Sequence, residues 1–160
     1  DNFLYLGLIK ALFPRARIVY ASRNVLDNAL SLWAQNLDAR FNYANDLRHI
    51  VHYNAQLQRL MAHWGTLFGE DILEVNYDRF VADQRPQTAR LLEFCGLDWS
   101  DAGLRFHERD STVRTASLWQ VRQPLYQRSS GRWRHYRDEL GELLDYLREL
   151  GLAGMAEDPA

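Results

Sequence analysis

The hydrophobic positions of the chain alternate between helical spacing and short continuous runs. Apolar side chains over residues 3–13 cover a broad helical face, and Pro14 ends that segment because proline cannot continue a helix. Residues 17–21 (RIVYA) are β-branched and aromatic, which predicts a strand covered on both faces. Asn24 then caps a helix in which apolar residues repeat at helical spacing up to Trp33.

The middle of the chain repeats this order on a longer scale. A long amphipathic helix is predicted over residues 46–68, and Gly69 ends it. Residues 72–77 predict a second strand, followed by a helical turn at 78–80 and a helix over 86–95. Such alternation favours an α/β fold, a three-layer α/β/α arrangement with a parallel sheet, in which ligands bind beyond the carboxyl ends of the strands.

The last third of the chain is less regular. Between Phe106 and Gly131 the periodicity fades into a polar, arginine-rich stretch. A final helix is predicted to begin near Arg132, and its apolar face carries Leu140, Leu143, Leu144 and Leu147. With 47% hydrophobic residues and 12% aromatic residues, the 160 residues can fill one core, so we expect a single domain over residues 1–160.

Composition narrows the partners that the protein can take. The chain has 19 basic and 21 acidic residues, a net charge of −2, so no global field attracts nucleic acid or anionic lipid. Anion binding must come from a local cluster, and every basic residue except Lys10 is arginine, whose forked donors suit phosphate. The lone Cys95 cannot form an internal disulfide and falls on the predicted buried face of its helix.

Two further features concern the setting of the chain. No apolar run approaches the roughly 18 residues that cross a bilayer, so we expect a soluble protein in the reducing cytoplasm, without a membrane partner. The chain begins at Asp1 without a methionine, and we interpret it as part of a larger protein.

The most informative segment runs over residues 18–33. A cation, Arg23, stands at the exit of the first strand, and the hydroxyl of Ser31 follows eight residues later, roughly two helical turns. A phosphate beside the start of that helix could pair with the guanidinium fork and accept a bond from the hydroxyl. The competing interpretation of Arg23 is a surface ion pair.

This segment resembles the 3′-phosphate-binding motif of sulfotransferases, which use 3′-phosphoadenosine 5′-phosphosulfate (PAPS) as donor. Residues 2–18 look like the approach to that motif in bacterial sulfotransferases, including those with tetratricopeptide repeats, and in tyrosylprotein sulfotransferases. The resemblance implies a P-loop-type fold with a helix-rich C-terminal half. It also implies transfer of a sulfuryl group to an acceptor hydroxyl or amine, with this chain as the C-terminal portion of the domain.

Two other stretches support the resemblance. Residues 72–80 (ILEVNYDRF) resemble the family's strand that ends in tyrosine and an acidic residue, which implies that Tyr77 lies near the donor nucleotide. Residues 115–136 are similar to the C-terminal donor-binding region of the bacterial group, rather than to the Arg-Lys-Gly triplet of cytosolic sulfotransferases. The resemblance implies that the 3′-phosphate and its ribose are bound by Arg122, Ser129 and Arg132. The competing interpretations are that the tyrosine packs in the core and that the arginines are exposed on the surface.

The phosphosulfate loop of the family, which resembles Pro-Lys-Ser-Gly-Thr-Thr, does not occur in this sequence. The sole lysine, Lys10, falls inside a predicted helix, and the family's general base usually lies between that loop and the point where this chain begins. The catalytic residues are therefore unassigned, no metal is implied, and we expect the isolated chain not to turn over PAPS.

Other sites and functions stay open. His49 and His52 stand at i and i+3 on the long helix, a spacing that can hold one metal, but no third ligand follows at a telling distance. His107, Asp110, Ser111 and Ser117 could form a hydrolase triad, yet the nucleophile elbow Gly-x-Ser-x-Gly is absent. Trp119 and Trp133 could stack an adenine or an acceptor ring, or pack the domain.

The alternatives for the whole protein are a non-catalytic nucleotide-binding or protein-interaction module of the same fold, and a kinase-type nucleotide-binding domain. For a transferase, the acceptor could be a peptide tyrosine, a carbohydrate or a small molecule. A homo-oligomer and an upstream repeat domain are further partners that this interpretation allows.

Overall fold

The fold centres on two parallel strands. A computed structural model describes residues 2–35, 37, 39–105 and 129–156. Strands β1 (Ile18–Ser22) and β2 (Ile72–Asn76) pair in parallel from Ile18↔Ile72 to Ser22↔Asn76. The predicted α/β class with a parallel sheet is thus confirmed.

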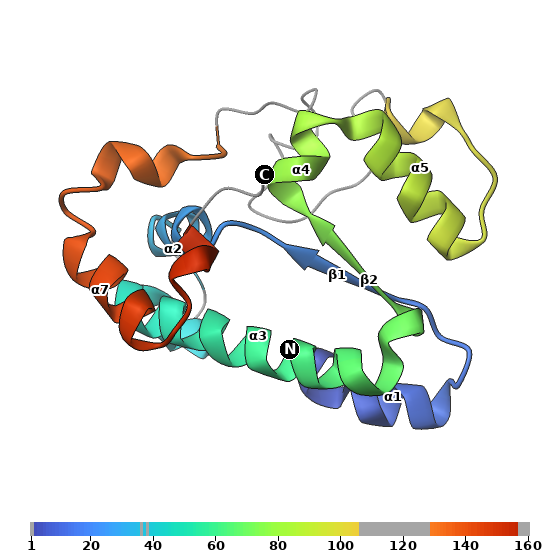
Figure 1. The fold of residues 1–160 in the computed structure, drawn as a ribbon, viewed down its shortest axis with the longest axis horizontal. Helices are drawn as coiled ribbons and strands as arrows, with labels where there is room; N and C mark the ends of the chain where they lie inside the picture. Colours follow the sequence, from blue (N-terminus) through green and yellow to red (C-terminus); the bar gives the residue numbers. More distant parts are fainter. Residues whose placement is uncertain (1, 36, 38, 106–128, 157–160) are drawn as a thin grey trace.

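Helices surround the strands. The α-helices are α1 (Leu6–Leu12), α2 (Val25–Trp33), α3 (Leu47–Phe68), α4 (Tyr77–Ala82), α5 (Gln84–Cys95) and α7 (Gly141–Glu149). Short 3₁₀ segments are η1 (Asn2–Tyr5), η2 (Ala39–Asn45), η3 (Gly69–Asp71), η4 (Asp101–Gly103), η6 (Arg132–Tyr136) and η7 (Ala153–Ala156). In Figure 1, α1 and α3 lie on one side of the strands and α4 and α5 on the other, while the C-terminal segments lie toward the carboxyl ends of the strands.

Local capping explains where the main helices begin. The Asn24 side chain accepts hydrogen bonds from the backbone N–H groups of Leu26 and Asp27 at 3.0 and 3.2 Å, as its predicted cap position requires. Asp46 caps α3 in the same way, accepting from the N–H of His49 at 2.9 Å. These caps satisfy donors that have no partner inside the helix.

Three expectations about burial and length need correction. The strand at residues 17–21 is not covered on both faces, because Val19 is 45% exposed and Ala21 is exposed while Ile18 and Tyr20 are half-buried. Its continuous apolar pattern reflects β-propensity rather than two-sided burial. Cys95, expected on a buried face, is only half-buried.

The predicted last helix is in fact two pieces. Residues near Arg132 form the short η6, and the α-helix begins only at Gly141. The side chains of Arg137, Asp138 and Glu139 between them are exposed, and apolar helical spacing starts at Leu140. A charged stretch without an apolar face gains nothing from packing as a helix.

The main core joins the strand exit to the C-terminal helix. Its buried side chains come from α2 (Val25, Leu26, Ala29), α3 (Ile50, Val51), η6 (Trp133) and the segment leading through α7 (Leu140, Leu143, Leu147). Leu26, Ile50 and Leu147 are completely inaccessible. The helix that follows β1 is therefore fixed by packing on α3 and on the C-terminal segments η6 and η7. No helix in the described ranges has the length and apolarity that crossing a membrane requires.

Lys10, the sole lysine, ties the loop after α1 to the start of β2. Its ammonium is 2.7 Å from a carboxylate oxygen of Asp71 and donates to the carbonyls of Pro14 and Ala16. The side chain is buried inside these contacts, so its charge is fully used within the fold.

Tyr20 provides a titratable probe of the β1–α3 contact. Its hydroxyl accepts a hydrogen bond of 2.9 Å from Nε2 of Gln58 on α3. Burial of the phenol, with a smaller contribution from the charge of Glu74, raises the pKa of Tyr20 to about 12.

We predict that one tyrosine, missing in Tyr20→Phe, titrates near pH 12 in ring-carbon NMR. Because the unfolded phenol ionises near its ordinary pKa of about 10, the folded protein holds this proton longer and loses stability as the pH rises from about 10 to about 12. Titration of Tyr20 near pH 10 would mean that the contact with α3 is open to solvent.

The packing of the core predicts a large loss of stability when a buried side chain of α7 is shortened. Leu147→Ala removes a fully buried side chain and should lower the free energy of unfolding by about 2–5 kcal/mol. Leu67→Ala is the matched control, because Leu67 is 56% exposed on α3 and its loss should cost no more than about 0.5 kcal/mol. Urea denaturation measures both, and equal effects would contradict the packing of α7 into this core.

Candidate functional site

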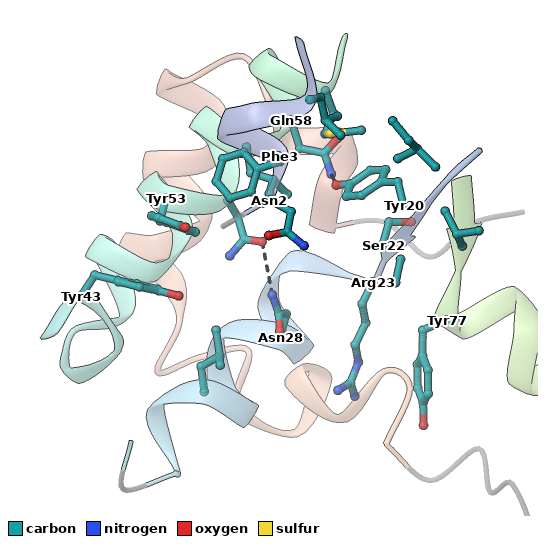
Figure 2. A pocket seen from close by; sticks show the side chains of 18 residues that line it. Asn2, Phe3, Tyr20, Ser22, Arg23, Asn28, Tyr43, Tyr53, Gln58 and Tyr77 are labelled. Atoms are coloured by element: carbon teal, nitrogen blue, oxygen red, sulfur yellow. Dashed lines mark hydrogen bonds between the residues drawn. The ribbon is translucent and has the colours of Figure 1, made fainter. Parts of the chain in front are cut away.

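The candidate site lies where the two strands end. Ser22 and Asn76 are paired at the last register position, and Nδ2 of Asn76 lies 3.4 Å from Oγ of Ser22. The next residues, Arg23 and Tyr77, therefore leave the sheet side by side. Figure 2 shows their side chains extending in the same direction, and the guanidinium carbon of Arg23 is 4.9 Å from the centre of the Tyr77 ring.

The guanidinium of Arg23 is only partly used. Nη2 donates to the carbonyl of Ser129 at 2.6 Å. Nε is buried and has no hydrogen-bond partner among the residues that the structure describes, and within the same residues Arg23 makes no salt bridge. A buried N–H of a cation without an acceptor is costly, so this group is suited to receive an anionic ligand.

Two aspartates hold a C-terminal turn against this arginine. Asp27 on α2 accepts from the backbone N–H of Gly131 at 2.6 Å and from that of Trp133 at 2.8 Å. Asp78 at the start of α4 accepts from the hydroxyl of Ser130 at 2.6 Å and from the N–H of Asn24 at 3.0 Å. The turn is thereby fixed to the exits of both strands.

The two acids occupy different environments. Asp27 is only 2% exposed, and burial is the main reason that its pKa is raised above the ordinary value. The N–H groups of Trp133 and Gly131 and the charge of Arg23 act in the opposite direction, while the charge of Asp78 adds to the rise. Asp27 is thus a buried acid whose ionised form depends on its contacts with the turn and with Arg23.

A cavity of about 530 Å³ adjoins the arginine between β1, α2 and α3. Figure 2 shows its lining, which is rich in aromatic rings and side-chain amides: Phe3, Tyr20, Tyr43, Tyr53, Tyr77, Asn2, Asn28 and Gln58. Tyr43 and Tyr53 stack with ring centres 4.3 Å apart, and the amide of Asn28 donates to that of Asn54 at 3.2 Å. The lining of the cavity therefore combines aromatic and polar side chains, and Arg23 is the positively charged residue in it.

The structure brings together some of the residues that the sequence singled out. Arg23, Tyr77 and Ser129 meet, although Ser129 contributes its backbone carbonyl to the contact with Arg23. Ser31 lies half-buried on α2, one turn beyond Asp27, and makes no hydrogen bond to Arg23. Arg132 is exposed. Arg122 lies outside the described residues.

Other candidates take different places. Nδ1 of His52 lies 2.7 Å from the hydroxyl of Tyr146, and within the described ranges no three acidic, histidine or cysteine side chains gather as a metal site. Trp133 is 7% exposed and packs in the main core. Trp119 and the triad candidates at 107, 110, 111 and 117 fall outside the described residues.

Sequence reasoning missed Asp27, Asp78 and Ser130. Asp27 had a possible signal, since it is an acidic residue between apolar neighbours on a helix that packs into the core. Acidic residues are common in the first turn of a helix because they interact favourably with the helix dipole. The position of Asp27 therefore gave no sign that it contacts the turn at 129–133. Asp78 was noted only as the acidic residue after Tyr77, and its contact with Ser130 spans 52 residues, so no local feature of the sequence indicated it.

Comparison with known proteins adds the family. A model described as the sulfotransferase family matches residues 1–101, which include both strands, Arg23, Ser31 and Tyr77. An uncharacterised protein of Aquifex aeolicus (strain VF5) is 38% identical over 151 residues, which is 92% of this chain and 20% of that protein. The chain thus spans about a fifth of the length of this relative. Since the family model covers more than half of the chain and includes both strand exits, the chain belongs to the sulfotransferase family.

Proposed function

We propose that the protein containing this chain transfers a sulfuryl group from PAPS to an acceptor hydroxyl or amine. In this proposal the chain supplies the side of the donor site that binds the 3′-phosphate and the adenine. The observation that carries the proposal is the buried Nε of Arg23, which has no hydrogen-bond partner in the described part of the chain and lies where two parallel strands of a sulfotransferase-family fold end. Ligands of open parallel sheets bind at this edge.

The surroundings of Arg23 favour a ligand phosphate, rather than a carboxylate of the protein itself, as the anion that pairs with the guanidinium. Among the described residues, Asp27 and Asp78 are acids near Arg23, and the oxygens of both accept hydrogen bonds from groups other than Arg23. Among the described residues, Nε of Arg23 therefore has no acceptor and can donate to a ligand. A forked guanidinium can give two parallel hydrogen bonds to a phosphate, which fixes orientation as well as position.

The remaining predicted residues complete this side of the donor. Tyr77, already against the guanidinium, would contact the nucleotide, and Ser31 would donate its hydroxyl to the 3′-phosphate. Arg122, Ser129 and Arg132 would contribute to the 3′-phosphate and ribose. These groups bind and orient the donor, which lowers the barrier by positioning rather than by bond chemistry.

In the reaction, the acceptor oxygen or nitrogen forms a bond to sulfur while the bond from sulfur to the bridging phosphate oxygen breaks. The acceptor proton passes to a general base, and 3′-phosphoadenosine 5′-phosphate leaves. Lys10, the sole lysine, is committed to Asp71 within the fold and is not assigned to the phosphosulfate, and no residue of this chain is assigned as the base. Peptide tyrosine, carbohydrate and small-molecule acceptors all fit this chemistry.

Nucleotide binding tests the role of Arg23. In the whole protein, Arg23→Ala should weaken binding of 3′-phosphoadenosine 5′-phosphate by roughly one to two powers of ten, because a charge-assisted hydrogen bond is worth about 1.5–3 kcal/mol. Binding of adenosine 5′-phosphate, which lacks the 3′-phosphate, should stay unchanged. Titration calorimetry with both nucleotides measures this difference.

The matched control is Arg59→Ala, since Arg59 is an exposed arginine on α3 that bonds Gln56. It should leave both affinities unchanged. Equal weakening of the two nucleotides by Arg23→Ala would remove Arg23 from the 3′-phosphate site. Selective binding without transfer of labelled sulfate from PAPS to any acceptor class would favour the non-catalytic nucleotide-binding module.

A further inference from the structure

The turn over residues 129–133 is held by side chains that lie far away in the sequence. Arg23, Asp27 and Asp78 each hydrogen-bond to it, through the carbonyl of Ser129, the N–H groups of Gly131 and Trp133, and the hydroxyl of Ser130. Gly131 has φ of 73°, a left-handed conformation that glycine adopts without strain and that shapes the turn. The position of the Ser129 carbonyl is therefore set by the strand exits.

Asp27 makes the most extensive of these attachments. Each of its oxygens accepts one N–H, at 2.6 and 2.8 Å, from residues that are 104 and 106 positions away. An aspartate whose only role was to favour the start of α2 would be exposed to solvent near its own helix terminus. Asp27 is instead 2% exposed and points its acceptors at another segment.

The turn over residues 129–133 also determines the orientation of the Arg23 guanidinium. The 2.6 Å bond from Nη2 to the carbonyl of Ser129 restrains one end of the guanidinium, and the Tyr77 ring lies 4.9 Å from its centre. With Nη2 restrained, the direction of the unpartnered Nε is restrained as well, because the guanidinium is planar and rigid. A turn that moved away would free the arginine to adopt other rotamers.

We propose that Asp27 is a positioning residue of the 3′-phosphate site, which holds the turn at 129–133 so that the Ser129 carbonyl orients Arg23 toward the phosphate. A carboxylate repels a phosphate, so Asp27 does not bind the phosphate directly. Its favourable effect on phosphate binding comes from the orientation of Arg23. This inference rests on the proposed function, and it assigns to Asp27 an effect on nucleotide selectivity in addition to any effect on stability.

The test is a double-mutant cycle in the whole protein, with 3′-phosphoadenosine 5′-phosphate and adenosine 5′-phosphate as the probes. Asp27→Asn keeps the size of the side chain but turns a donor amide toward one of the two N–H groups. It should lower the ratio of the two affinities about tenfold or more, while binding of adenosine 5′-phosphate is unchanged. In the Arg23→Ala background, Asp27→Asn should cause no further change in the ratio of the two nucleotide affinities.

Asp46→Asn is the matched control, because Asp46 also accepts a backbone N–H, that of His49 at 2.9 Å, and asparagine caps a helix equally well. It should not change the ratio. If Asp27→Asn does not fold, Ser130→Ala removes a single attachment of the same turn, the hydroxyl bonded to Asp78, and should lower the ratio about three- to tenfold.

Two outcomes overturn the inference. One is an unchanged affinity ratio in Asp27→Asn, or in Ser130→Ala where the first variant is unfolded. The other is an equal loss in the presence and absence of Arg23, which would show that Asp27 does not act through the arginine. Failure of the proposed function gives a different result, since Arg23→Ala alone would then leave the ratio unchanged.

Discussion

The carboxylate of Asp27, buried at the start of α2, accepts two backbone N–H groups from a segment that follows it by more than a hundred residues. A buried charge is costly unless it is fully hydrogen-bonded, and here both oxygens have donors. The same contact brings Trp133 into the core cluster that includes Leu26 and Leu147. The buried acid and the apolar packing of α7 therefore favour the same placement of the C-terminal segment, and each would be weakened by loss of the other.

This placement completes the site at the strand exits. The family match ends at residue 101, so the turn at 129–133 lies beyond the part of the chain that the family model describes. That turn is nevertheless joined to the matched part, because Arg23 donates a hydrogen bond to it and Asp27 and Asp78 accept hydrogen bonds from it. The proposed donor site is thus assembled from two segments, one that carries the cation and the tyrosine and another that restrains the cation.

Local features of the sequence were read correctly because their causes are local. The cap at Asn24 and the start of the long helix near residue 46 depend on neighbours within a few positions, and both strands follow from short β-branched runs. The family resemblance implied that Arg23 and Tyr77 both lie near the donor nucleotide, and their contact at adjacent strand exits agrees with that expectation. By contrast, the contacts of Asp27 and Asp78 depend on how distant segments pack, which no spacing along the chain encodes. The exposed face of β1 was missed because a β-branched run looks alike whether one or two faces are covered.

In the proposed site, the 3′-phosphate of the sulfate donor binds at Nε of Arg23, the buried donor that lacks an acceptor among the described residues. The most direct measurement is a crystal structure of the whole protein with 3′-phosphoadenosine 5′-phosphate bound. We expect a 3′-phosphate oxygen at about 2.7–3.2 Å from the Arg23 guanidinium, with Tyr77 beside the nucleotide and the turn at 129–133 still attached to Asp27. A 3′-phosphate bound elsewhere, with Arg23 contacting only Tyr77 and the Ser129 carbonyl, would contradict it.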